Sequence, residues 1–234
     1  PTFQAQVVAV TKTEQFSSED VFLKDILDPP SASAINSATP LSSTDVVSRQ
    51  LFSDYMGLAS QGRATSENLS GLAGEYADSI LGQTLPSKNV EMDRIIIVSD
   101  SELNLSQYGQ SIATVREKYK NLVEKRYHDN NIGNLNSSAF QVFISEVSKL
   151  YESSAQELLS IAVPASLAEN HRALVNNHIS SALAMKTLAK MNEDPVIAYT
   201  AMTNQTQNGK EETELLLNIQ VTLMANGIIL ERDL

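Results

Sequence analysis

The stretch from residue 163 to 191 limits the possible folds more than any other part of the chain. It reads VPASLAENHRALVNNHISSALAMKTLAKM. Its apolar residues recur at alternating spacings of three and four, which is the period of one face of an α-helix. Ser166 and Glu169 match a capping box, and Asp194-Pro195 ends the pattern. At about 1.5 Å per residue this helix would span roughly 35–40 Å, a length typical of a helical bundle.

The same period predicts helices before and after this central one. They cover residues 44–62, 65–82, 105–127, 137–162 and 195–226, and a short one is expected within 17–27. Thr44, Thr65 and Ser137 or Ser138 are the expected N-caps, because their hydroxyls can accept from the first free backbone amides. The first two long helices should pair as a hairpin, 44–83. Its first helix should bury a stripe of six residues: Val47, Leu51, Phe52, Tyr55, Met56 and Leu58.

Three details of this pattern leave alternatives open. The run Ile95–Val98 has the composition of a β-strand, and its partner would be Val7–Val10 or Ile228–Leu230. Gly71 and Gly74 weaken the second hairpin helix, so a close helix approach is expected there. The last helix has a polar middle, so it either breaks at Gly209 or extends into water beyond the bundle.

These elements predict an all-α fold. We expect a bundle of about six helices with a three-helix antiparallel C-terminal core, 137–226, and at most one short β element. Residues 1–43 form an N-terminal arm with the short helix and a Ser/Ala/Pro-rich linker, whose order between residues 28 and 44 is open. Residues 44–234 form a single helical domain, in which the hairpin and the 105–127 helix pack on the core.

Charge and composition exclude several classes of function. The chain has 234 residues, a formal charge of −11 and no clustered basic surface in its sequence, which argues against binding nucleic acid. It has no Cys, so thiol catalysis and Cys-ligated zinc are excluded. No apolar run reaches the roughly 18–20 residues that span a bilayer. Membrane attachment is therefore expected only through a segment that would precede Pro1.

Sequence motifs that would indicate an enzyme are absent. The chain contains no GxGxxG, GxxxxGK[ST], GxSxG or SxxK pattern, so no catalytic or cofactor-binding residues are expected. The polar loop 128–136 fails the calcium-loop count, because Phe140 occupies the position of the bidentate Glu. The acids Glu211, Glu212 and Glu214 most simply form a solvated face. No cofactor or metal is expected.

Two histidines lie on the apolar face of the central helix. His171 and His178 are seven residues apart, about 10 Å along the axis, which is too far for both to bind one metal ion. Satisfied, half-buried histidines are the simpler interpretation. The alternative is a pocket between helices for a small ligand or cell-wall fragment near Tyr151, His171 and His178.

The order of segments resembles a family of extracytoplasmic helical proteins found in candidate-phylum bacteria of the Patescibacteria type. Three stretches between residues 44 and 230 carry the resemblance: TDVVSRQLFSDYMGLASQG, the Ile run with LSQYGQSIATVREKY, and VPASLAENHRALVNNHISSALAMKTLAKMNEDPVIAYTAM. The resemblance implies an α-helical domain behind a membrane anchor or signal segment. It implies no catalytic residues.

These observations predict a non-enzymatic scaffold in the bacterial cell envelope or on the cell surface. It would be anchored by its missing N-terminus and would bind another protein. The acidic charge, the long helices and the missing catalytic motifs favour this function. Binding of a small ligand or cell-wall fragment is the alternative, and an enzyme without a sequence signature is a third possibility.

Overall fold

The computed structural model describes residues 41–86, 89–129 and 137–230, and this part of the chain contains six α-helices. Their bounds are α2 Ser43–Ser60, α3 Ser66–Leu81, α4 Glu102–Asp129, α5 Ser138–Leu159, α6 Ala168–Leu188 and α7 Pro195–Ala225. The all-α prediction is confirmed. Residues 1–40 of the expected 1–43 arm, including the short helix in 17–27, and most of the loop tested for calcium lie outside the described residues.

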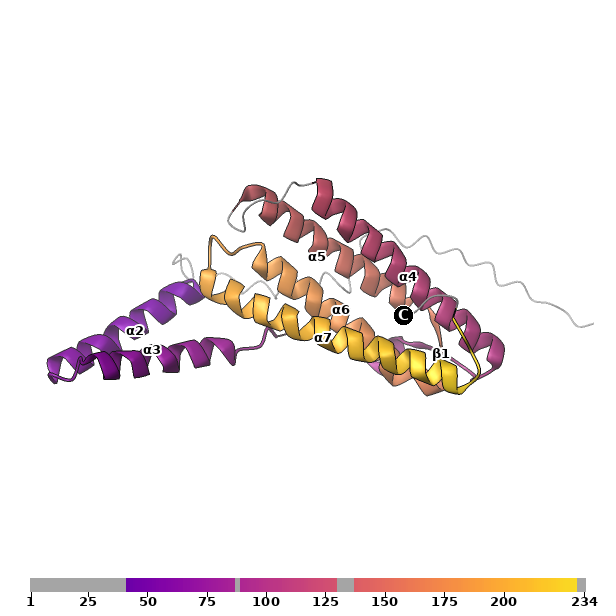
Figure 1. The fold of residues 1–234 in the computed structure, drawn as a ribbon, viewed down its shortest axis with the longest axis horizontal. Helices are drawn as coiled ribbons and strands as arrows, with labels where there is room; N and C mark the ends of the chain where they lie inside the picture. Colours follow the sequence, from indigo (N-terminus) through magenta and orange to yellow (C-terminus); the bar gives the residue numbers. More distant parts are fainter. Residues whose placement is uncertain (1–40, 87–88, 130–136, 231–234) are drawn as a thin grey trace, which may run out of the picture. The chain divides into compact units, whose positions relative to one another are not determined.

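The helices α4 to α7 pack side by side, with α6 between α5 and α7 and α4 against α5 (Figure 1). The central helix is the most buried, because its apolar face contacts neighbours on two sides. Its buried side chains include Leu174, Val175 and Ile179. The predicted C-terminal core of three helices is therefore confirmed.

The start of the central helix differs from the prediction. Residues Ala162–Pro164 form a short strand, β2, and Ala165–Leu167 form a 3₁₀ turn, so α6 begins only at Ala168. Ser166 does not cap the helix. Its amide and its hydroxyl both donate to the Asp100 carboxylate, each at 3.0 Å, which fixes this turn on the segment before α4.

The predicted strand exists as β1, Ile96–Val98; of the two partners proposed for it, Ile228–Leu230 forms no strand and Val7–Val10 lies outside the described residues. Instead, β1 pairs with β2 in parallel, with Ile96 beside Ala162 and Val98 beside Pro164. Parallel strands need a long crossover connection. Here α4 and α5 provide it, so two short segments more than sixty residues apart share the hydrogen bonds that neither could form alone.

The polar middle of α7 neither breaks the helix nor leaves the bundle. The helix is continuous through Gly209. Asn208 is buried. Its backbone carbonyl accepts from the Asn177 side chain at 2.9 Å, and its side-chain amide donates to the Ser180 hydroxyl at 3.2 Å. Both alternatives in the sequence analysis were wrong because polar residues on α6 provide the partners.

The hairpin of α2 and α3 joins α7 through polar contacts at its ends. Ser42, not Thr44, caps α2, in a capping box with Asp45. The Thr44 hydroxyl instead donates to Asp194 at 2.7 Å and accepts from the Val196 amide at 3.1 Å. Thr44 therefore helps to cap α7, a helix 150 residues later in the chain.

Candidate functional site

His171 is completely buried and has a partner on each ring nitrogen. Its Nδ1 is 3.2 Å from the Tyr108 hydroxyl, and its Nε2 is 3.1 Å from the Leu158 carbonyl. The carbonyl can only accept, so Nε2 carries the proton and Nδ1 accepts from Tyr108. Burial lowers the pKa of His171 to about 4, since desolvation disfavours the charged ring. This neutral ring connects α4, α5 and α6.

Tyr151 and His178 meet at a different place in the bundle. Their rings are 5.5 Å apart in an edge-to-face arrangement, and the Gln205 side-chain amide donates to the Tyr151 hydroxyl at 3.4 Å. Burial, followed by the charge of Glu212, raises the pKa of Tyr151 to about 12. The phenol is therefore neutral near pH 7.

The carboxylate of Glu212 lies 3.4 Å from His178 Nε2. Of the three acids expected on a solvated face, Glu211 and Glu214 are exposed, but Glu212 is only half-exposed because it turns toward this ring. His178 Nδ1 and the hydroxyl of Ser154 are covered and have no hydrogen-bond partner among the described residues. These two polar atoms are therefore out of reach of a ligand that enters the site.

These side chains border a cavity of about 390 Å³ that is lined by residues of α4, α5, α6 and α7. Its size falls within the range of pockets that hold small organic molecules. Seven of its 15 lining residues are aliphatic: Ile112, Val115, Val123, Leu150, Leu158, Leu174 and Leu216. Of the three residues proposed from sequence, Tyr151 and His178 line the cavity and His171 does not.

The outer edge of the cavity is charged. Arg116, Lys120 and Glu124 follow one another at intervals of four on α4, so they lie on one side of that helix. Lys120 and Glu124 are 4.0 Å apart and both are exposed. Sequence reasoning singled out none of these three residues.

A second candidate site is the surface of α2, where the predicted buried stripe was wrong. Neither α2 nor α3 buries a residue. Phe52 is 64% exposed and Met56 49% exposed, and of the six residues only Val47 and Leu58 are half-buried. Two amphipathic helices cover one narrow strip of each other, so a stripe this wide keeps one side uncovered.

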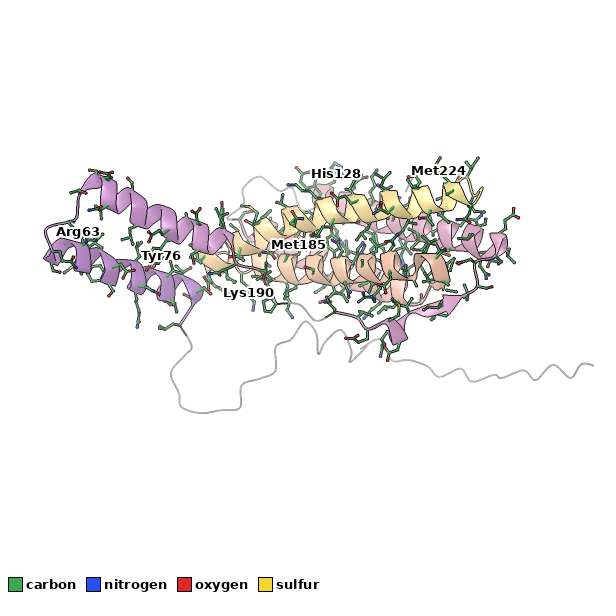
Figure 2. The ribbon with its side chains drawn as sticks, turned by 90° about the horizontal axis from the view of Figure 1, so that it is seen from below. Arg63, Tyr76, His128, Met185, Lys190 and Met224 are labelled. Atoms are coloured by element: carbon green, nitrogen blue, oxygen red, sulfur yellow. The ribbon has the colours of Figure 1, made fainter. Side chains whose placement is uncertain are left out.

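The turn and the inner side of this hairpin are well formed. Arg63 marks the turn and Tyr76 lies on α3 (Figure 2), where the Tyr76 hydroxyl donates to Asp54 at 2.6 Å. The expected close approach at Gly71 and Gly74 is absent, because no atom of a neighbouring element lies within 4 Å of a Cβ built there.

No group of His, Asp and Glu within residues 41–86, 89–129 and 137–230 could hold a metal ion. In the same part of the chain, no helix combines the length and apolarity required to cross a membrane.

The fold and the two sites define a class: an acidic α-helical bundle with an interhelical cavity and an appended helical hairpin. Comparison with models of protein families, with curated proteins and with solved structures gave no match.

Proposed function

We propose that this chain is a non-enzymatic helical scaffold that binds another protein through α2. One observation carries the proposal: α2 has an amphipathic sequence and yet buries none of its residues. Leu51, Phe52, Tyr55 and Met56 occur at spacings of one, three and four, so their side chains form one continuous apolar surface, called here the α2 face. Single exposed apolar residues are ordinary, but contiguous ones indicate a binding surface.

The charge around the α2 face suggests what covers it. Residues 43–81 contain five carboxylates and two arginines: Asp45, Asp54, Glu67, Glu75 and Asp78 against Arg49 and Arg63. A second copy of the chain would place like charges opposite one another, which disfavours that pairing. We therefore assign the face to an amphipathic helix of another protein, with basic residues beside its apolar stripe.

Such a partner would complete a packing arrangement that the hairpin lacks. Helical layers are stable when each apolar stripe is covered by another element. The hairpin is fixed to α7 at its ends. There the side-chain nitrogen of Asn204 donates to the Gln83 carbonyl at 3.2 Å, and its side-chain oxygen accepts from the Leu85 amide at 3.3 Å. These bonds hold the α2 face in place while its apolar side chains remain available.

The location that best suits this function is the bacterial cell envelope or surface. The absence of Cys, the acidic charge and the resemblance of residues 44–230 to extracytoplasmic helical proteins support it. In this proposal a segment before Pro1 would anchor the domain and the hairpin would bind its partner.

The test is site-specific photocrosslinking in source cells. A photoreactive phenylalanine analogue replaces Phe52 in one variant and Met56 in another. The control places it at Gln50, which is exposed on the same helix but roughly on the opposite side, at about 100° per residue. We expect adducts with one other protein from positions 52 and 56 and none from position 50.

The peptide from the partner should form an amphipathic helix with basic residues. An adduct between two copies of the chain would contradict the proposal, as would an adduct within the chain to residues 1–40. Equal labelling from position 50 would also contradict it, because the contact would then not depend on the α2 face.

A further inference from the structure

We propose that the cavity lined by α4, α5, α6 and α7 binds an uncharged, mainly apolar molecule that carries one hydroxyl group. The apolar body of the ligand would lie against the aliphatic lining, and its hydroxyl would accept a hydrogen bond from Tyr151. No lining residue belongs to α2 or α3, so this site is separate from the α2 face and goes beyond the protein-binding function. The two proposals therefore succeed or fail independently.

Five aliphatic residues of the lining are almost completely buried, which suits an apolar ligand. Ile112, Leu158 and Leu174 are at most 2% exposed, and Val115 and Leu216 are each 5% exposed. The two polar atoms of the lining that lack a partner are themselves covered. A ligand with a polar body would lose its hydration here without gaining hydrogen bonds in return.

The size of the cavity sets the size of the ligand. An engineered apolar cavity of about 150 Å³ accommodates benzene. This cavity measures about 390 Å³, so it has room for a body larger than a single ring, such as a ring that carries a carbon chain. Burial of that body removes apolar surface of both the ligand and the lining from water, and this is the main source of affinity.

The charged residues of the lining favour a ligand without net charge. Arg116 and Lys120 are cationic, Glu124 and Glu212 are anionic, and with His178 neutral their formal charges cancel. Lys120 and Glu124 are 4.0 Å apart, and the Glu212 carboxylate lies 3.4 Å from His178 Nε2. An ionic ligand would lose part of its hydration at the cavity without meeting an excess of the opposite charge. An uncharged ligand does not have this cost.

The hydroxyl of Tyr151 can bind a polar group on the ligand. It accepts from the Gln205 side chain at 3.4 Å, and its own proton has no acceptor within the described residues. The other tyrosine of the lining differs, because Tyr119 already donates to Glu157 at 3.0 Å. A ligand hydroxyl suits this site better than a carbonyl, since it can accept from Tyr151 and can also donate to Glu212, a carboxylate in the same lining.

The test measures displacement of phenylnaphthylamine, an uncharged dye that fluoresces in apolar surroundings, from the purified chain. Four competitors share a phenyl ring with a chain of the same length: phenylbutanol, butylbenzene, phenylbutanoate and phenylbutylammonium. We expect phenylbutanol to bind most tightly and butylbenzene about fivefold more weakly, because it lacks the hydrogen bond. Both ions should bind about tenfold more weakly or worse, because of their hydration.

The two tyrosines of the lining provide a matched pair of variants. Tyr151→Phe removes the hydroxyl assigned to the ligand, whereas Tyr119→Phe removes one that donates to Glu157. We expect Tyr151→Phe to weaken phenylbutanol binding about fivefold and butylbenzene binding less than about twofold, as the loss of one uncharged hydrogen bond predicts. Tyr119→Phe should change neither by more than about twofold. A loss of folded protein would weaken both ligands equally, so the comparison of two ligands on each variant recognises it.

Leu150→Trp tests whether the cavity itself is the site. Leu150 is half-buried in the lining, so a tryptophan there occupies the space that the ligand needs. Val142→Trp is the control, because it places the same side chain on α5 at a position that is 51% exposed and outside the lining. We expect Leu150→Trp to abolish binding of the dye and Val142→Trp to retain it. If thermal melting shows that Leu150→Trp is unfolded, Leu150→Phe replaces it.

Five results would overturn the proposal. The first three concern the unmodified chain: it binds neither the dye nor phenylbutanol, either ion competes as well as phenylbutanol, or butylbenzene and phenylbutanol bind equally. The other two concern the variants: Tyr119→Phe weakens phenylbutanol binding as much as Tyr151→Phe does, or a folded Leu150→Trp protein binds the dye as well as the unmodified chain.

Discussion

His171 and His178 occupy the same side of α6 and yet have different surroundings. His171 bridges Tyr108 and the Leu158 carbonyl and is fully buried. His178 lies between Tyr151 and Glu212, at the cavity. The two residues lie on one face of α6, so the helix itself gives them equivalent positions. Only the neighbouring helices make His171 a structural histidine and place His178 at the border of a pocket.

The buried ring of His171 makes stability depend on pH. Its pKa is about 4 in the folded chain and 6.5 when unfolded. The stabilisation is therefore fully present above pH 6.5 and is lost as the pH falls toward 4, because the unfolded chain binds the proton more tightly. Between about pH 7.5 and 5.5 the free energy of unfolding should fall by about 1.4 kcal/mol from this residue.

Urea denaturation at both pH values measures this loss. The variant His171→Phe removes the titrating group, so the difference in pH dependence from the unmodified chain isolates its contribution. His128→Phe, at the exposed end of α4, is the matched control and should retain the full dependence. An unchanged dependence in His171→Phe would show that the ring does not titrate in this way.

At the scale of elements, Asp194 joins the N-termini of two helices. Its carboxylate accepts from the Ser43 amide at 2.6 Å and from the Thr44 amide at 3.0 Å at the start of α2, and from the Ile197 amide at 3.4 Å in α7. Burial alone would raise its pKa, but the bonds from Thr44, Ser43 and Ile197 outweigh this and lower it. The negative charge also suits both helix dipoles.

Removing this carboxylate should loosen α2 without unfolding the bundle. Asp194→Ala leaves several amides without a partner, and we expect it to destabilise the attachment by roughly 1–3 kcal/mol. Hydrogen exchange should accelerate in α2 and stay unchanged in α6. Glu193→Ala removes an exposed charge next to it and serves as the control. Equal acceleration in α6 would contradict a local role for Asp194.

Local sequence predicted some element ends correctly and missed others for a clear reason. Thr65 and Ser137 are N-caps as expected, and Gly62 and Gly227 follow α2 and α7 with φ of 67° and 79°. These ends depend on bonds within a few residues. Thr44 and Ser166 bond instead to Asp194 and Asp100, which are distant in sequence, so local spacing assigned them the wrong role.

At the scale of the whole molecule, the proposed location can be tested directly. Intact source cells are treated with a protease that does not enter them, and the chain is then detected by antibody. We expect it to be cut from whole cells, since an envelope or surface protein is accessible there. A cytoplasmic protein of the same cells should survive until lysis, and protection of this chain to the same extent would contradict the proposed location.

The sequence by itself determined that the fold is all-α, where most helices of the described residues lie, and that the last three form a core. Helical period and capping chemistry act over a few residues, so they can be read locally. The tertiary structure alone decided that β1 pairs with β2, that Phe52 and Met56 are exposed, and that the middle of α7 remains in the bundle. An apolar stripe in the sequence indicates only that one face of a helix is suited to packing against another element. Whether it is covered depends on contacts between segments distant in sequence, and that is why the α2 face and the cavity emerge only in the folded chain.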